Sequence, residues 1–238
     1  MRNWASARKN FNIPDNMAEQ IYQEYKNSIA LPLKKPTRQF MLCPVGLVGS
    51  GKSTVVKVLA QKLFLVPISS DEFRRRFKGL GFNYDRAKEL AMRVGREFVE
   101  SGYSVAFDMN CGSPGSKKDI AQIESQYGIP TVWIHVNPPE DFILNKLKNY
   151  PHTWLFSSGE EAVKGYFKYK EAFGDFDFIC EIDPSRDDLP EQIENTLNQT
   201  GKKIIDTTGS RLTFPRIDVY AALLLLNRTI FTTPDLGT

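Results

Sequence analysis

A glycine-rich segment near the start of the chain constrains the fold more than any other feature. Residues 46–54 read Gly-Leu-Val-Gly-Ser-Gly-Lys-Ser-Thr and fit the pattern G-x-x-x-x-G-K-[ST] at every position. Glycines let backbone N–H groups turn inward around phosphate oxygens, where a side chain would block the approach. An apolar run at 40–45 precedes the segment and helical spacing follows it over 53–64, which is the strand–loop–helix context of a phosphate-binding loop. The sequence therefore predicts a nucleoside triphosphate site at this turn.

The residue types in the loop indicate how the nucleotide would be held. Lys52 would place a mobile ammonium on the β- and γ-phosphates, where it would also serve catalysis, and Ser53 would offer a hydroxyl to Mg²⁺. The helix that follows would direct its positive end at the anion. We therefore expect ATP and Mg²⁺ as cofactors. The predicted nucleotide contacts are Gly46, Val48, Gly49, Ser50, Gly51, Lys52, Ser53 and Thr54.

The rest of the chain alternates between strand-like and helical patterns. Apolar runs typical of strands lie at 40–45, 65–68, 103–108, 131–136 and 176–182, with a sixth candidate at 203–205. Helical spacing of apolar residues covers 53–64, 84–101, 117–127 and 189–197. Strands that alternate with helices imply crossover connections and a parallel sheet covered on both faces. We predict an α/β fold of three layers (α/β/α) around a mainly parallel five-stranded sheet.

Three classes of phosphate-loop protein compete at this stage. GTPases read guanine with N-K-x-D, but residues 145–148 read Asn-Lys-Leu-Lys and lack the carboxylate. Motor ATPases usually end an apolar strand in adjacent acids, whereas the strand at 103–108 ends in Asp108 alone. A kinase is favoured by Asp71, which follows the strand at 65–68 and could accept the proton of an attacking hydroxyl. Arg74, one helical turn further, could hold a phosphate; the alternative for Asp71 is a simple helix N-cap.

The order of these motifs resembles a known family. A phosphate loop, then D-x-[FY]-R, then an apolar strand ending in aspartate is similar to the P-loop kinases related to polynucleotide 5′-hydroxyl kinase and zeta toxin, an AAA-type kinase group; the likeness runs from about residue 40 to 197. The resemblance implies that Asp71 is the general base, that Arg74 contacts substrate or phosphate, and that Asp108 lies near Mg²⁺ or substrate. It implies metal ligands Ser53 and Asp108. The implied substrate-binding residues are Asp71, Arg74, Asp108 and Asn110.

The chain departs from this family in one respect. The family carries arginines in the segment after the fourth strand, but no arginine lies between Arg96 and Arg186. We expect residues 147–169 to form a mobile lid whose cations are lysines, which lack the bidentate fork of arginine. The candidates are Lys146, Lys148, Lys164 and Lys168. A loop at 206–210 is a candidate for holding adenine.

Composition and length bound the remaining questions. The 238 residues are 41% hydrophobic and 25% charged, as in ordinary globular proteins, and the net charge of +3 is too weak to demand a nucleic-acid partner. The longest apolar run, 221–226, is far shorter than the roughly 18–20 residues of a membrane span. Three cysteines without metal-site spacing indicate free thiols, and no secretory signal follows the N-terminus, so we expect a cytoplasmic protein without a membrane partner.

These observations combine into one organisation and two functional hypotheses. We predict an N-terminal helical extension at 1–38 with a helix near 16–29, a P-loop kinase domain at 39–210, and a C-terminal tail at 211–238 with a candidate helix at 219–226. The favoured function is transfer of the γ-phosphoryl group of ATP to a hydroxyl of a nucleic-acid end, a nucleoside or a nucleotide sugar. The alternative is a nucleotide-binding regulatory module without phosphotransfer.

Overall fold

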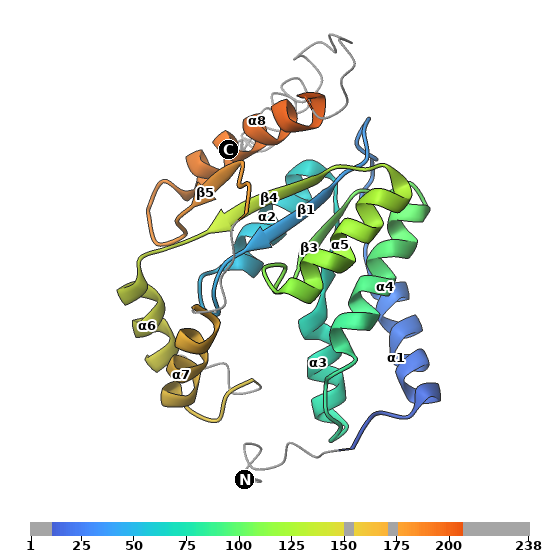
Figure 1. Cartoon of the computed structure of the whole chain (residues 1–238), viewed down its shortest axis with the longest axis vertical. Helices are drawn as coiled ribbons and strands as arrows, with labels where there is room; N and C mark the ends of the chain where they lie inside the picture. The colour runs from blue at the N-terminus through green and yellow to red at the C-terminus, as the bar shows by residue number, and fades with distance from the viewer. Residues whose placement is uncertain (1–10, 150–154, 171–175, 207–238) are drawn as a thin grey trace, which may run out of the picture.

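The computed structural model of the chain describes residues 11–149, 155–170 and 176–206. Five strands form one sheet, every pair of them parallel, in the order β2-β3-β1-β4-β5 (Figure 1). The strands are β1 Met41–Val45, β2 Val66–Ser69, β3 Val105–Asp108, β4 Thr131–Val136 and β5 Cys180–Ile182. Because β1 lies between β3 and β4, the strand order reverses at its carboxyl end, which is where open α/β sheets bind ligands. The predicted α/β fold with a five-stranded parallel sheet is confirmed.

Helices connect and flank the strands. They are α1 Asp15–Ser28, α2 Lys52–Leu63, α3 Ser70–Gly79, α4 Ala87–Glu100, α5 Pro114–Tyr127, α6 Glu140–Asn149, α7 Gly159–Lys170 and α8 Leu189–Asp206. The helices predicted from apolar spacing are all present, and α8 is longer than expected. The strand considered at 203–205 is wrong, because these residues continue α8. The candidate helix at 219–226 lies outside the described residues, and within them no helix has the length and apolar character of a membrane span.

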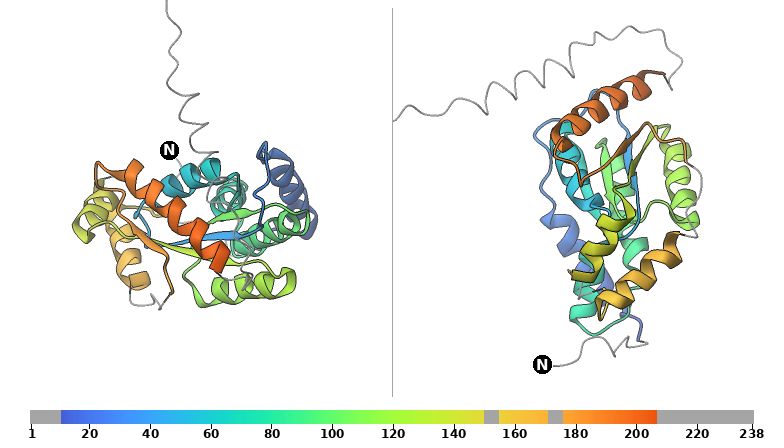
Figure 2. Two further views of the ribbon diagram at one scale, coloured as in Figure 1. Left: turned by 90° about the horizontal axis from the view of Figure 1, so that it is seen from above. Right: turned by 90° about the vertical axis from the view of Figure 1, so that its left-hand side faces the viewer.

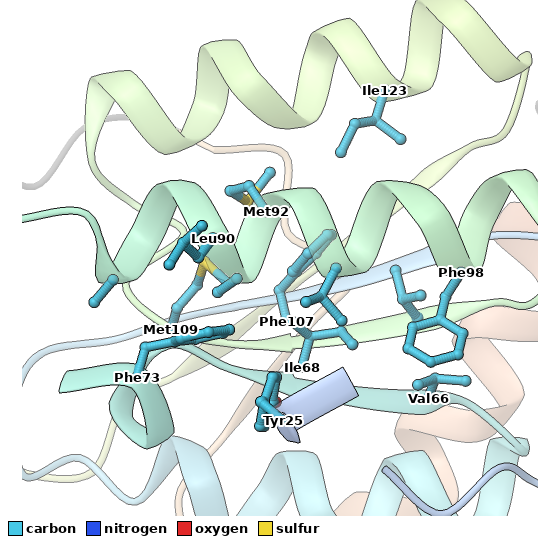
Figure 3. Packing of buried hydrophobic residues seen from close by; sticks show 14 of the residues in the cluster. Tyr25, Val66, Ile68, Phe73, Leu90, Met92, Phe98, Phe107, Met109 and Ile123 are labelled. Carbon is cyan, nitrogen blue, oxygen red and sulfur yellow. The ribbon is translucent and has the colours of Figure 1, made fainter. Parts of the chain in front are cut away.

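Each face of the sheet is covered by helices (Figure 2). On one face, apolar side chains of α2 and α8, such as Leu59 and Leu197, pack with Leu42 and Ile134 from the strands. On the other face, α4 and α5 pack against the strands, and this cluster also includes residues of α1 and α3 (Figure 3). Every residue of β1 is buried, which explains why its sequence reads as a continuous apolar run.

Helix α1 packs on the outside of α3 and α4 rather than standing apart from the domain (Figure 1). Its apolar face contributes Ile21, Tyr22 and Tyr25 to the main cluster, each at most 5% exposed. Three ion pairs join α1 to α4 and its N-cap residue Arg86: Lys26 with Glu97 at 2.5 Å, Arg86 with Asp15 at 2.6 Å and Arg93 with Glu19 at 2.7 Å. Since these pairs are partly exposed, the apolar face supplies most of the attachment.

Helices α6 and α7 form a separate small unit beyond the carboxyl ends of the central strands (Figure 1). Their buried residues make a cluster of their own, apart from the two clusters that cover the sheet: Ile143, Leu147, Phe156, Ala162 and Tyr166. This cluster continues onto Leu47 and Val48 of the glycine-rich loop. The described residues of the segment predicted as a lid are therefore largely helical, and their apolar cluster packs on the phosphate-binding turn.

Candidate active site

The loop at 46–54 connects β1 to α2 and has the backbone of a phosphate cradle. Gly49 and Gly51 have φ of 84° and 94°, in the left-handed region that favours glycine. A Cβ at Gly46 would lie 2.4 Å from the carbonyl oxygen of Val136 at the end of β4, so no side chain fits there. The glycines of the motif are thus required by the turn itself, and they leave the N–H groups of the turn uncovered by side chains at these positions.

Neighbouring elements hold this loop on two sides. A Cβ at Gly49 would lie 3.0–3.2 Å from side-chain atoms of Leu147 and Ile143 on α6, and one at Gly51 would lie 3.2 Å from Pro184, just after β5. Ser50 is fully buried, and its hydroxyl has no hydrogen-bond partner in the described part of the chain. An orphaned buried hydroxyl inside a glycine cradle fits a site completed by an oxygen-rich ligand such as a phosphate.

Lys52 folds back over the loop. Its Nζ donates hydrogen bonds to the carbonyl oxygens of Gly46 and Leu47, each at 2.8 Å. Burial of the ammonium lowers the pKa of Lys52 to about 8, although the negative charges of Asp108 and Asp71 oppose this shift. The ammonium therefore lies within electrostatic reach of both carboxylates that the sequence singled out.

Ser53 and Asp108 meet across the carboxyl edge of the sheet. The hydroxyl of Ser53, in the first turn of α2, donates to Oδ1 of Asp108 at 2.9 Å. Burial raises the pKa of Asp108, and the negative charge of Asp71 raises it further. The hydrogen bond from Ser53 and the charge of Lys52 lower it. The two predicted metal ligands are thus in direct contact.

This pair fits Mg²⁺ as part of a coordination shell. A hydroxyl and a carboxylate are the hard oxygen donors that Mg²⁺ prefers. Over the residues with described positions, no group of three or more His, Cys, Asp or Glu side chains could hold a metal ion by itself. A site of this kind takes its remaining ligands from phosphate oxygens and water, as Mg²⁺ sites of nucleotide-binding proteins usually do.

Asp71 and Arg74 lie together on α3. Nη1 of Arg74 bonds Oδ1 of Asp71 at 3.0 Å, and the Asp71 side chain is 35% exposed, so it is reachable by a substrate. The N-cap residue of α3 is Ser69, not Asp71, and the Ser69 side chain makes no capping hydrogen bond. Asp71 sits instead in the first turn, where an acid is favoured by the helix dipole. The alternative of Asp71 as the N-cap is wrong.

The other candidate residues are distributed around this centre. Asn110 is exposed two residues beyond Asp108, and its carbonyl accepts from Ser116 Oγ at 2.7 Å. Thr54 is exposed at the start of α2, and Val48 packs toward α6 and α7. Arg186, in the loop that passes Gly51, bonds Asp188 at 2.5 Å. The candidate adenine loop begins at the end of α8, and its residues 207–210 lie outside the described residues.

Among the lid lysines, one lies close to the phosphate loop. Lys146 lies on α6 beside Leu147, whose side chain packs at Gly49, and its charge contributes to the lowered pKa of Lys52. Lys148, Lys164 and Lys168 are exposed. The sequence does not distinguish these four lysines, because the packing of α6 on the loop decides which of them acts on Lys52.

Tyr25 is a neighbour of the site that sequence reasoning missed. Its hydroxyl oxygen accepts a hydrogen bond from the backbone N–H of Ser69 at 2.8 Å, at the point where β2 becomes α3. Tyr25 belongs to α1, 44 residues upstream, and its position in an amphipathic helix indicates only a core residue. The sequence holds no signal for this contact.

Comparison with known proteins agrees with this architecture. Residues 41–153 match the family described as an AAA domain. A gluconokinase from Sinorhizobium meliloti shares 15% identity over 72% of this chain and 98% of its own, with a TM-score of 0.51. A Chloroflexus aurantiacus protein assigned provisionally as a kinase shares 14% identity over 71% of this chain and 100% of its own, with a TM-score of 0.57. No curated protein matches the sequence. At these identities the two structures show a shared α/β fold and nothing finer.

Proposed function

We propose that this chain is an ATP- and Mg²⁺-dependent kinase that transfers the γ-phosphoryl group to an alcohol hydroxyl. The observation that carries the proposal is that Asp108, at the end of β3, and Asp71, in the first turn of α3 after β2, lie at the same edge of the sheet as the loop, since Ser69 pairs with Asp108 and Ser53 donates to Asp108. The charges of both carboxylates also act on the pKa of Lys52. A nucleotide-binding module needs the loop alone. A kinase also needs a carboxylate near the γ-phosphate to accept the proton of the acceptor hydroxyl, and Asp71 on α3 is that carboxylate.

The donor half of the site would be the loop at 46–54. Its N–H groups and the N-terminus of α2 would hold the phosphates, and Lys52 would exchange its bonds to Gly46 and Leu47 for phosphate oxygens. Lys146 is the lid residue best suited to add positive charge on the γ-phosphate. Mg²⁺ held by Ser53 and Asp108 would neutralise phosphate charge.

The acceptor half would be Asp71 with Arg74. The Asp71 carboxylate would accept the proton of the acceptor hydroxyl as its oxygen attacks the γ-phosphorus. The new P–O bond would form while the bond from the γ-phosphorus to the β–γ bridging oxygen breaks, and ADP would leave with that electron pair. Arg74 would keep Asp71 oriented and hold acceptor or phosphate oxygens, and exposed Asn110 would contact the acceptor.

The finer assignment follows the motif order. We propose membership of the polynucleotide 5′-hydroxyl kinase and zeta-toxin-like group, with a nucleic-acid 5′ end, a nucleoside or a nucleotide sugar as acceptor. We propose the cytoplasm as the compartment, because the thiols of Cys43 and Cys111 are free and buried, as is usual where thiols stay reduced.

A transfer screen tests the kinase proposal. The protein is incubated with γ-³²P-labelled ATP, Mg²⁺ and one acceptor from each class, namely a 5′-hydroxyl oligonucleotide, a nucleoside and a nucleotide sugar. We expect labelled product with one class in the wild type and none with Lys52→Ala. Tight ATP binding without label on any acceptor would contradict the proposal.

A regulatory module without phosphotransfer is the second candidate. It is favoured by the lid, since α6 and α7 carry no arginine and the guanidinium of Arg186 is bonded to Asp188. Lysine supplies charge but less orientation of a transferring phosphoryl group. The same screen separates the two functions: the module would bind ATP and Mg²⁺ and leave every acceptor unlabelled.

A further inference from the structure

Helix α1 reaches the candidate active site through one side chain. Ser69 is both the last residue of β2 and the N-cap of α3, and its N–H donates to the hydroxyl oxygen of Tyr25 at 2.8 Å. The region that matches the AAA domain family begins at residue 41, so this contact comes from a part of the chain outside that match. Asp71 follows Ser69 by two residues.

The contact satisfies a backbone group that the sheet leaves open. Strand β2 is at the edge of the sheet, so no further strand can accept from its outer side. A backbone N–H that loses water without gaining an acceptor is costly, and Tyr25 supplies the acceptor for Ser69 in this partly buried bond. The junction between β2 and α3 therefore depends on α1 for one of its hydrogen bonds.

Packing fixes the Tyr25 ring. Tyr25 is 5% exposed, and its ring meets the Phe73 ring edge-to-face, with centroids 4.7 Å apart and planes at 64° (Figure 3). Phe73 is fully buried, and in the sequence of α3 it lies between Asp71 and Arg74. The aromatic contact and the hydrogen bond thus hold the first turn of α3 from the same helix α1.

The hydroxyl also lies within electrostatic range of the site. Burial raises the pKa of Tyr25 to about 12, and the charges of Glu72 and Asp108 contribute to this shift. In the register of β2 with β3, Ser69 is the direct partner of Asp108. Ser69 therefore stands opposite one carboxylate of the site and two residues before the other.

We propose that Tyr25 is a positioning residue for Asp71, and that α1 is part of the catalytic unit of this protein. The inference rests on the proposed kinase function. By fixing the N–H of Ser69, the Tyr25 hydroxyl sets where α3 begins and so where the Asp71 carboxylate stands relative to the γ-phosphate. ATP binding depends on the loop at 46–54 and does not require this contact.

The test compares two matched substitutions in the full chain. Tyr25→Phe keeps the ring on Phe73 and removes only the hydroxyl, whereas Tyr22→Phe removes a hydroxyl one turn earlier, where the Tyr22 ring packs under Arg93 on α4. We expect kcat for phosphoryl transfer to fall about 10-fold in Tyr25→Phe, as for a misplaced reacting group, with the Kd for a non-hydrolysable ATP analogue within 2-fold. Tyr22→Phe should leave both values within 2-fold.

A double variant shows whether Tyr25 acts through Asp71. If it does, adding Tyr25→Phe to Asp71→Asn causes no further loss of kcat, because the group being positioned is already gone. If Tyr25→Phe lowers kcat by the same factor in wild type and in Asp71→Asn, the inference is overturned. It is also overturned if Tyr25→Phe and Tyr22→Phe lower kcat equally. Either result leaves the proposed kinase function unaffected. Wild-type protein that transfers phosphate to no acceptor would overturn both.

Amide exchange measures the contact itself. In the peptide that spans β2 and the start of α3, we expect faster hydrogen exchange in Tyr25→Phe than in wild type, and no change in Tyr22→Phe. Unchanged exchange in Tyr25→Phe would mean that the hydroxyl does not hold this junction, and would overturn the inference whatever the kinetics show.

Discussion

The Ser53 hydroxyl donates to the Asp108 carboxylate at 2.9 Å, and this bond joins the first turn of α2 to the end of β3. It connects the proposed nucleotide half of the site to the proposed acceptor half, because Asp108 also stands opposite Ser69, directly before α3. The charge of Asp71 raises the pKa of Asp108, and the charge of Lys52 lowers it. The site is therefore one electrostatic unit, and changing any of these groups should affect the others.

Loss of the Lys52 ammonium should impair the use of ATP. We expect Lys52→Ala to weaken ATP binding strongly or to abolish turnover, since no other residue of the 46–54 loop supplies a mobile positive charge. Isothermal titration with a non-hydrolysable ATP analogue measures this. Lys57→Ala, an exposed lysine of α2, is the matched control and should bind as wild type does. Equal affinities of the two variants would argue against the role of Lys52.

ATP affinity should depend on pH through Lys52. Its pKa in the free protein is about 8, below the ordinary 10.5, so the free site loses its ammonium as the pH rises through about 8. Phosphate oxygens favour the charged form, so binding at pH 8 to 9 should take up a proton and affinity should fall as pH rises. Titrations in buffers of different ionisation enthalpy count that proton. Binding without proton uptake in this range would contradict the shift.

The metal requirement should change when Asp108 is neutralised. We expect Asp108→Asn to raise the Mg²⁺ concentration needed for half-maximal turnover on the order of 10-fold, because an amide oxygen is a weaker Mg²⁺ ligand than a carboxylate. ATP binding without metal should not weaken, since a negative charge beside the phosphates is lost. Asp85→Asn, in the loop before α4, is the control. An unchanged Mg²⁺ requirement in Asp108→Asn would remove Asp108 from the metal site.

The pair α6 and α7 should behave as a lid. Its apolar cluster is small and separate from the clusters that cover the sheet, so we expect faster hydrogen exchange there than in α4. A non-hydrolysable ATP analogue with acceptor should slow exchange in α6 and α7, because closure brings positive charge to the phosphates and excludes water. Strong protection without ligand that does not change on binding would mean that this unit is a fixed part of the domain.

The sequence predicted those features that local patterns encode. The 46–54 loop was predictable because binding phosphate requires glycines and a lysine at fixed positions along the chain. The strands were predictable because buried parallel strands are continuous apolar runs in the sequence. The residues 203–205 were misread as a strand since so short an apolar run does not distinguish a strand from a helix. Apolar spacing does not mark α3, because Phe73 and Phe77 are its only buried apolar side chains in a strongly charged segment, and the helix was indicated only by the positions of Asp71 and Arg74.

Contacts between distant segments could not be predicted from those patterns. The bond of Tyr25 to Ser69 joins residues 44 positions apart, and it depends on how α1 packs on α3. The same holds for Lys146, whose approach to Lys52 depends on the packing of α6 on Gly49. Patterns along the chain give the elements and the reactive residue types, whereas tertiary packing selects which of those residues meet.

The role of Asp71 as the general base can be measured by comparing wild type with a variant that lacks the carboxylate. Single-turnover transfer from γ-³²P-labelled ATP to the best acceptor is measured for wild type and Asp71→Asn, beside the Kd of each for a non-hydrolysable analogue. A positioned base predicts that Asp71→Asn lowers the transfer rate on the order of 100-fold or more while the Kd stays within a few fold. A variant that transfers phosphate at the wild-type rate, or that loses affinity and rate equally, would contradict the assignment of Asp71 as the base of a kinase.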